Sequence, residues 1–230
     1  MVIIKVLEKM KKSLSKLKFY INDRGIFIYI LSLIFTAIYD LTIQHLWRIE
    51  LYLRGVTLEK FFIFKIIGRP IVSRVPGSII KLGKSVTLMS SSRRCLSASL
   101  NSACKLSTIY RSASIVLEDG VSLNGASIVS RSKSIHIGKN TMIGPNCVIM
   151  DSPFHHVKPA DNRNLYSGFE LDQDIKIGKN VWLGANVLIL AGSIIGDNSV
   201  VGAGSVVKGC IPPNCVSAGA IVEIKRFFED

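Results

Sequence analysis

The 230-residue sequence has only five cysteines, and no two of them stand in the C-x-x-C spacing of a zinc site or a redox pair. An odd number without regular spacing also gives no basis for a disulfide framework. We therefore expect reduced thiols in the cytoplasm and no metal site. Cys147 and Cys215 fall among small apolar residues, so we expect them to fill space in a core.

A hydrophobic run long enough to span a membrane is also missing. The most apolar stretch, residues 26–39, is shorter than the roughly 20 residues that a spanning helix needs, and Asp40 follows it. No small-residue cleavage site is present either, so we do not expect a secretory signal peptide. Two interpretations of residues 26–46 remain open. They form a helix in the membrane interface, with residues 1–60 contacting anionic lipid, or an amphipathic helix packed on the β domain or on a neighbouring subunit.

Acidic residues are scarce in the first half of the chain. Residues 71–114 have 7 basic and no acidic side chains, and residues 1–70 have 12 basic and 5 acidic ones. Residues 115–230 are nearly neutral, with 10 basic and 11 acidic side chains. Enzymes that act on nucleic acids bring their positive field to the active site, whereas here the charge is remote from the motif-rich half. A membrane surface or an acidic polymer fits this distribution, and we do not expect nucleic acid as a partner.

The second half is built on a repeat of six residues. The apolar positions of this repeat are Ile137, Ile143, Ile149 and, after an interruption, Ile177, Leu183, Ile189, Ile195, Val201 and Val207. A glycine often follows, an asparagine often stands three positions later, and a small residue four positions later. Because Gly and Asn tolerate left-handed backbone conformations, each hexad predicts a short strand and a tight corner. A fixed short period indicates a solenoid, and a helix is excluded because each recurring glycine would cost about 1 kcal/mol.

Weaker hexads precede this tract. They are centred on Leu82, Leu88, Leu117, Leu123 and Val129, with a slip of two residues before Ile137. We expect residues 93–111 to bulge out or to form an irregular coil. The predicted parts of the chain are an N-terminal helical extension at 1–70, a β domain at 71–219 with a loop at 151–174, and a C-terminal tail at 220–230.

The tract IGKNVWLGANVLILAGSIIGDNSVVGAGSVVKGCIPPNCVSAG, residues 177–219, resembles the hexapeptide-repeat acyltransferases, in particular the sugar and polysaccharide O-acetyltransferases. The resemblance implies a mainly β fold, a left-handed parallel β-helix with three hexads per triangular turn, here preceded by the helical extension. It also implies a homotrimer with active sites between subunits. The donor implied is acetyl-CoA, and the acceptor is a sugar of a surface polysaccharide or of its precursor.

The loop at 151–174 interrupts the hexads and holds two of the four histidines in the chain. Acyl transfer to a hydroxyl needs a base that works near neutral pH, and histidine is the side chain best suited to it. In the related loop the family has an Asp, an aromatic residue and then the catalytic His. The resemblance therefore makes His155 the general base and places Asp151 at the acceptor. Arg163 matches an acceptor-binding arginine or is a solvated loop charge, and His156 remains an alternative base or acceptor contact.

Further residues of this sequence match functional positions of the family. Asn124 matches an asparagine that assists catalysis, although Asn-Gly is also a common corner dipeptide. Trp182 matches a tryptophan that lines the tunnel near the acceptor, or else it is a core or interface aromatic. The expected contacts of the acetyl-CoA donor are Gly184, Ala185, Gly202, Ala203, Lys208 and Arg226.

These residues define the predicted function, a metal-independent, cytoplasmic O-acetyltransferase acting at the inner face of the cytoplasmic membrane. His155 removes the proton of a sugar hydroxyl, and the oxygen attacks the thioester directly in a ternary complex. Backbone N–H groups stabilise the developing oxyanion. The alternative is a non-catalytic hexapeptide-repeat scaffold or glycan-binding protein, supported by departures from the family pattern at Pro153, Gly209 and residues 220–223.

Overall fold

The computed structural model describes the chain in four stretches, residues 25–60, 64–155, 169–220 and 222–227. The chain forms two compact units, Met1–Ile43 and Gln44–Asp230. Helix α2 (Gly25–Leu53) begins in the first unit, which confirms the predicted helical extension. In that unit its side chains include exposed leucine, isoleucine, phenylalanine and tyrosine, which do not gather into one apolar stripe. Within the described residues, no helix combines the length and the apolar character needed to cross a membrane.

The second unit is a parallel β-helix of three sheets, in which every third strand of the chain joins the same sheet. The first sheet contains β1 (Thr57–Leu58), β4 (Ile79–Leu82), β7 (Ser114–Leu117), β10 (Ser134–Ile137), β13 (Ile175–Ile177), β16 (Ile194–Ile195) and β19 (Cys210–Ile211). The second contains β2 (Lys65–Ile67), β5 (Thr87–Met89), β8 (Ser122–Asn124), β11 (Met142–Ile143), β14 (Trp182–Leu183), β17 (Val200–Val201), β20 (Cys215–Ala218) and β21 (Glu223–Phe227). The third contains β3 (Ile71–Ser73), β6 (Lys105–Thr108), β9 (Ser127–Ser130), β12 (Val148–Met150), β15 (Leu188–Ile189) and β18 (Val206–Val207).

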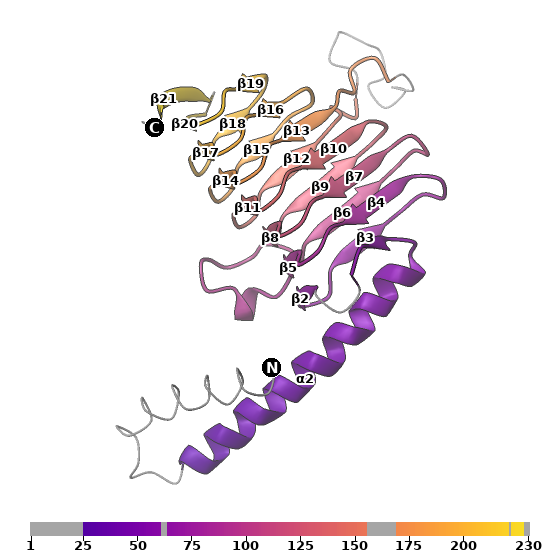
Figure 1. The fold of residues 1–230 in the computed structure, drawn as a ribbon, viewed down its shortest axis with the longest axis vertical. Helices are drawn as coiled ribbons and strands as arrows, with labels where there is room; N and C mark the ends of the chain where they lie inside the picture. The colour runs from indigo at the N-terminus through magenta and orange to yellow at the C-terminus, as the bar shows by residue number, and fades with distance from the viewer. Residues whose placement is uncertain (1–24, 61–63, 156–168, 221, 228–230) are drawn as a thin grey trace. The chain divides into compact units, whose positions relative to one another are not determined.

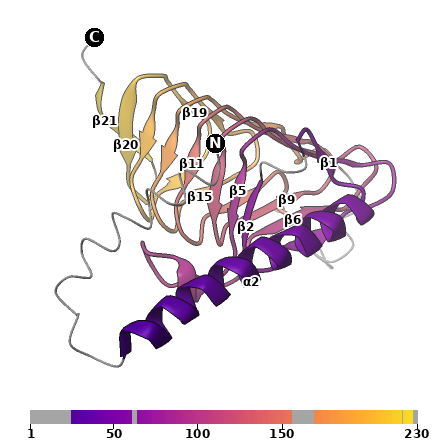
Figure 2. The ribbon, with the colours of Figure 1, turned by 60° about the horizontal axis from the view of Figure 1, so that its bottom comes forward.

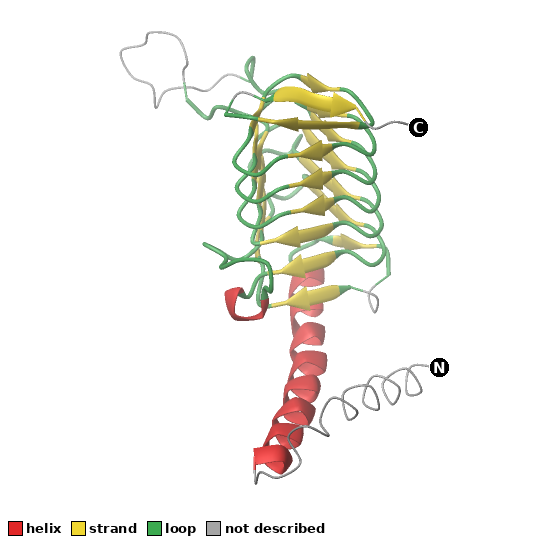
Figure 3. Cartoon of the chain, turned by 90° about the vertical axis from the view of Figure 1, so that its left-hand side faces the viewer, coloured by secondary structure: helices red, strands yellow, loops and turns green. Residues whose placement is uncertain are grey.

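The strands stack rung above rung, with the turns aligned along the edges between the sheets (Figure 3). All pairs are parallel except β20 with β21, which returns antiparallel on the last coil. Figure 2, turned to bring the first coils forward, shows the three sheets around one interior. A single hydrophobic core cluster runs through this interior from the first coil to the last.

The inward pattern predicted from the hexads is confirmed. The apolar positions from Ile137 to Val207 are at most 1% exposed, and so are the small residues predicted to point inward, Thr141, Cys147, Val181, Val187, Ser193, Ser199 and Ser205. The corner asparagines have the predicted left-handed backbone; they are Asn140, Asn146, Asn180, Asn186 and Asn198. Gly138 shows why a glycine recurs, because a Cβ there would lie 2.6 Å from the backbone of the next coil. Close stacking of the coils therefore excludes larger side chains at such positions.

The first coils differ from the prediction in where they begin. β1 and β2 lie before residue 71, and they pair with β4 and β5 of the next coil. Leu51 at the end of α2 is buried with Val56 and Phe64 in the same core cluster. The boundary at residue 71 is therefore too late. Residues 56–72 carry the apolar side chains of a coil, but they contain a single glycine, Gly68, and no asparagine, so the recurrence that revealed the later hexads is missing.

Two further differences concern the middle of the chain. Ile128, and not Val129, points inward, and it lies opposite Ile149 of the next coil. The preceding turn is one residue shorter than the hexad because Gly125 makes it at a φ of 55°. Only part of the predicted irregular segment is irregular. Residues 90–103, with a short 3-10 helix at Ser92–Arg94, protrude from the coil, and β6 then resumes the third sheet.

Candidate active site

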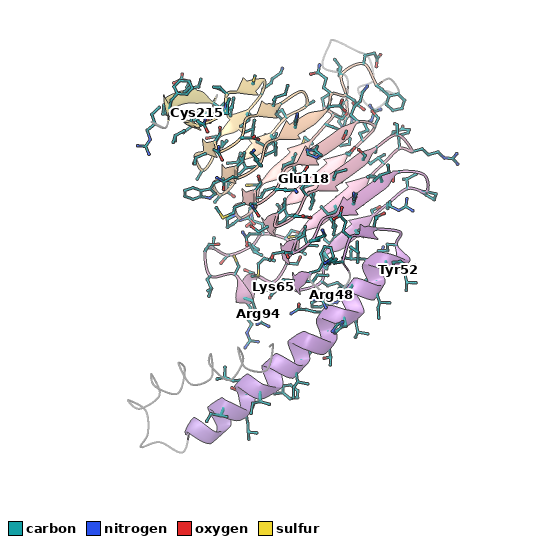
Figure 4. The ribbon with its side chains drawn as sticks, viewed as in Figure 1. Arg48, Tyr52, Lys65, Arg94, Glu118 and Cys215 are labelled. Carbon is teal, nitrogen blue, oxygen red and sulfur yellow. The ribbon has the colours of Figure 1, made fainter. Side chains whose placement is uncertain are left out.

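Two edges of the β-helix carry the predicted site residues. The loop edge is where the chain passes from the third sheet to the first, at residues 74–78, 109–113, 131–133, 151–155, 169–174, 190–193 and 208–209. The alanine edge is where it passes from the second sheet to the third, at residues 90–104, 125–126, 144–147, 184–187 and 202–205. In Figure 1 the described ends of the loop, residues 151–155 and 169–174, lie at the upper right, and the protrusion at 90–103 leaves at the lower left. Arg94, labelled in Figure 4, lies on that protrusion.

His155 is exposed, at the end of a short segment whose backbone is held in a fixed shape. The side chain of Ser152 is buried, and its Oγ accepts the backbone N–H of Phe154 at 3.0 Å. Phe154 has a φ of 64°, which is a left-handed conformation that a bulky residue adopts only when its surroundings impose it. His155 therefore leaves the β-helix in a direction set by Ser152 and Phe154.

Asp151 lies beneath this segment and is fully buried. Its carboxylate accepts hydrogen bonds from the Ser130 hydroxyl at 3.0 Å and from the backbone N–H groups of Arg131 at 2.6 Å, Ser132 at 3.2 Å and Lys133 at 2.8 Å. The resemblance of the loop to the acyltransferase family led us to expect Asp151 at the acceptor. In the structure its oxygens are engaged by the turn of the coil before the loop, so they face the wall of the β-helix.

The returning end of the loop is held by the same turn. The guanidinium of Arg131 donates to both carboxylate oxygens of Asp172, at 3.1 and 3.2 Å, and the Ser132 hydroxyl donates to Asp172 at 2.5 Å. The ring of Phe169 packs over the Arg131 guanidinium at 5.0 Å and edge-on against Tyr110 at 4.8 Å. We name Asp151, Asp172 and the turn 130–133 the loop clasp.

The sequence contains only a partial signal for the loop clasp. The slip of two residues before Ile137 falls on the turn 130–133, so it marked an unusual corner. The pairing of Arg131 with Asp172, 41 positions apart, has no local pattern that predicts it. His156 and Arg163, both predicted from the sequence, lie outside the described residues.

The predicted donor residues lie mainly on the alanine edge. A Cβ on Gly184 would lie 2.5 Å from the backbone nitrogen of Ala203, and one on Gly202 would lie 2.7 Å from the Cβ of Ala218. Coil stacking therefore accounts for both glycines. Ala203 is exposed, and a Cβ on the neighbouring Gly204 would meet nothing within 4 Å. This leaves backbone and small side chains open on the surface.

The remaining predicted donor residues lie close to this edge or on other parts of the coils. Ala185 lies on the alanine edge, half-buried, and its carbonyl accepts the N–H of Gly204 at 2.8 Å. Lys208 is exposed on the loop edge. Arg226 is exposed on β21, opposite Val216 of the second sheet.

Asn124 and Trp182 both belong to the second sheet. Asn124 ends β8, beside the alanine edge, and its side-chain amide donates to the Ile143 carbonyl at 3.1 Å. Trp182 is 51% exposed on the outer face of β14, next to Met142, which is equally exposed on β11. Trp182 is therefore not a core residue, whereas Asn124 already donates to a neighbouring coil.

One chain does not bring all these residues together. His155 and Lys208 stand on the loop edge, whereas Asn124 and Ala203 stand on or beside the alanine edge. The third sheet separates the two edges, and the four residues of β9 alone span about 13 Å. One chain therefore does not bring the two groups of residues into contact with each other.

Comparisons with known proteins agree with this fold. Residues 174–209 match the family model described as bacterial transferase hexapeptide (six repeats). No curated protein is significantly similar to the chain in sequence. Among solved structures, the polysialic acid O-acetyltransferase OatWY is 22% identical with a TM-score of 0.52, and the match covers 76% of this chain and 88% of OatWY. The N-acyltransferase AntD from Bacillus cereus, solved with dTDP-4-amino-4,6-dideoxyglucose and coenzyme A, is 13% identical with a TM-score of 0.50 over 75% of this chain and 80% of AntD.

A third structure is that of PerB from Caulobacter crescentus, solved with CoA and GDP-perosamine. It is 19% identical with a TM-score of 0.44, and the match covers 72% of this chain and 59% of PerB. The chain thus spans less than two thirds of that protein. The fold is the predicted left-handed parallel β-helix. Residues 174–209 therefore carry the hexapeptide repeats of bacterial transferases, and the three-sheet architecture of the whole second unit is the fold that such repeats build.

Proposed function

We propose that the chain is an O-acetyltransferase that moves an acetyl group from acetyl-CoA to a sugar hydroxyl of a surface polysaccharide or of its precursor. The observation that carries this proposal is the exposed His155 at the end of an anchored turn on a hexapeptide β-helix. OatWY and AntD have this fold and, by their names and ligands, act on a glycan or bind a nucleotide sugar with coenzyme A. We extend that substrate class to this chain as part of the proposal.

His155 is the general base of the proposed reaction. Its imidazole takes the proton of the acceptor hydroxyl while that oxygen forms a bond to the acyl carbon. The protonated imidazole then gives its proton to the departing sulfur as the carbon–sulfur bond breaks. A direct transfer of this kind leaves no acyl group on the protein, and backbone N–H groups stabilise the negative charge that develops on the carbonyl oxygen.

The surface around Ala203 fits the donor. Acetyl-CoA supplies an activated acyl group on a narrow pantetheine arm, and such an arm approaches a backbone closely only where side chains are small. Ala203 and Gly204 provide an exposed surface of this kind, and Ala185 adjoins it. Lys208 and Arg226 are exposed cations that we assign to the phosphates of the nucleotide.

The acceptor contacts are assigned to Trp182, His156 and Arg163, with Asn124 assisting catalysis. Asp151 is excluded from direct contact in this proposal because its carboxylate is buried in the loop clasp. A homotrimer joins the loop edge of one subunit to the second sheet and alanine edge of the next, and so completes the site. The exposed pair of Trp182 and Met142 supplies apolar surface for this interface.

The proposed setting is the inner face of the cytoplasmic membrane, where lipid-linked glycan precursors are made. The basic first half of the chain and the exposed apolar side chains of α2 support contact with an anionic lipid surface.

The test pairs an assay with a cell experiment. Purified chain is incubated with acetyl-CoA and matched acceptors that present either a hydroxyl or an amino group, and release of free coenzyme A is followed. Surface polysaccharide from cells with and without the gene is compared by mass spectrometry. Turnover with the hydroxyl acceptor and a mass difference of one acetyl group are expected. Transfer to the amino acceptor alone would contradict O-acetylation, and coenzyme A binding without turnover would favour the scaffold alternative.

A further inference from the structure

The loop clasp is an unusual feature among the turns of this β-helix. Three turns on the loop edge share a serine that donates to a carbonyl three residues away, at 2.6 Å in each case: Ser78 to Val75, Ser130 to Lys133, and Ser193 to Leu190. A serine therefore closes such turns without any charge. The turn 130–133 alone among these three adds a buried ion pair, between Arg131 and Asp172.

A buried ion pair is a costly way to stabilise a coil. The side chains of Arg131 and Asp172 are 5% and 0% exposed, so both charges have left water. The desolvation of such a pair often offsets its attraction, and apolar residues of the same size stabilise a fold equally well. What this ion pair adds is direction, because Nη1 of Arg131 must lie within hydrogen-bond distance of both carboxylate oxygens of Asp172. The pair therefore holds a defined geometry at the base of the loop.

Hydrogen bonds connect the ion pair to the segment that carries His155, by way of Asp151. The backbone N–H of Gln173, next to Asp172, donates to the carbonyl of Asp151 at 3.0 Å. The returning end of the loop is thereby joined to the outgoing end, and the same turn binds the side chains of both. Ser152 and Phe154 then fix the direction of the chain between Asp151 and His155.

We propose that Arg131 and Asp172 are positioning residues, which hold the two ends of the loop together through the turn 130–133 and so place His155 against the acceptor hydroxyl. This inference rests on the proposed function, because it assigns a catalytic consequence to the clasp. Neither residue touches a substrate. A displacement of about 1 Å at a reacting group typically costs about 10²-fold in rate, and this sets the size of effect that the clasp controls.

The test uses the full chain with two conservative variants, Asp172→Asn and Arg131→Lys. Asp172→Asn keeps the size of the side chain and removes the charge, whereas Arg131→Lys keeps the charge and loses the paired N–H bonds. Asp197→Asn is the matched control, because Asp197 also accepts a backbone N–H and pairs with a lysine, Lys179, but lies in the turn after β16, away from the loop edge. Ser132→Ala, which removes one hydroxyl from the clasp, is a milder variant in case the others fold poorly.

Three measurements distinguish a positioning role of Arg131 and Asp172 from a general effect on folding. We expect Asp172→Asn to lower kcat by about 10–10²-fold, with the KM for acetyl-CoA, the affinity for coenzyme A and the oligomeric state unchanged. Arg131→Lys should retain more activity than Asp172→Asn, and Asp197→Asn should match the wild type. Hydrogen–deuterium exchange should quicken at the amides of residues 131–133, which belong to the loop clasp, and at the amide of Gln173, which donates to Asp151.

The outcomes are distinguishable. An active wild type whose kcat is unchanged in Asp172→Asn, although the clasp amides exchange faster, would overturn the positioning role and leave the proposed function intact. Equal losses in Asp172→Asn and in Asp197→Asn would show a general effect on the β-helix and would overturn it too. An inactive wild type would overturn the proposed function, and with it the catalytic consequence assigned to the clasp, whereas the exchange result would still report the anchoring of the loop.

Discussion

Trp182 and Met142 lie side by side on the outer face of the second sheet, each 51% exposed. Two large apolar side chains in register on adjacent strands form a surface that one chain leaves uncovered. We predict that they pack against a neighbouring subunit in a homotrimer. Trp182→Ala should weaken the trimer and lower turnover, whereas Ile79→Ala, at a 52% exposed residue of β4 in the first sheet, should change neither. Light scattering at decreasing protein concentration measures the assembly, and a stable, fully active monomer would refute the prediction.

The second prediction separates the two adjacent histidines. His155→Ala should lower kcat by about 10²–10⁴-fold, since this is the usual contribution of general base catalysis. Coenzyme A affinity, measured by calorimetric titration, should barely change because the proposed donor contacts lie on other parts of the coils. His156→Ala should cost much less and serves as the control. If His156→Ala is the inactive variant, the loop alignment is off by one residue, and if both variants remain active, the general-base mechanism is wrong.

A third prediction concerns the membrane. Deleting residues 1–60 would remove Leu51 and Val56 from the core, so the cut belongs before Gln44, where the second unit begins. A chain lacking residues 1–43 should lose binding to vesicles of anionic lipid and keep turnover on a soluble acceptor. Flotation of vesicles with and without anionic lipid measures the binding. Vesicle binding that survives the deletion would place the contact elsewhere, and loss of the trimer would favour packing of the helix on a neighbouring subunit.

A fourth prediction concerns how the free energy of unfolding changes at alkaline pH. Burial raises the pKa of the Cys147 thiol to about 11, against an ordinary value of 9.0. The stability gained from keeping this thiol neutral is fully present below pH 9, where the unfolded chain is also protonated. Between pH 9 and 11 the unfolded chain loses its proton first, so the free energy of unfolding falls, by up to about 2 kcal/mol. Urea unfolding at pH 8 to 11 measures this decline. Cys147→Ala should be less stable at pH 8 and decline less steeply, whereas Cys210→Ala, at an exposed thiol, should match the wild type.

How far the sequence predicted the molecule depends on whether a feature is local. The hexads predicted the β-helix because each hexad contains the residues that determine its local structure. These are an inward apolar residue such as Ile143 and a corner residue with left-handed backbone such as Asn146. Val129 was misplaced because a single shortened turn at Gly125 shifts the register without disturbing the apolar pattern. The site was predicted less completely, since Arg131 and Asp172 meet only when the loop returns. Asp151 faces the wall of the β-helix because its carboxylate accepts the backbone N–H groups of residues 131–133, which are also distant in sequence.

The last prediction tests the donor surface on the alanine edge. Ala203 is exposed beside the open Gly204, so Ala203→Leu adds a side chain that points into solvent and leaves the coil stacking intact. If the pantetheine arm lies here, the added side chain occupies its path, and the dissociation constant for coenzyme A should rise at least tenfold, or about 1.4 kcal/mol. Ala203→Gly changes the same position without adding a side chain and should leave coenzyme A binding unchanged. Thermal unfolding checks that both variants keep the wild-type stability. Because this measurement needs no acceptor, it tests the donor site even before the sugar is identified, and an unchanged affinity in Ala203→Leu would move that site away from the alanine edge.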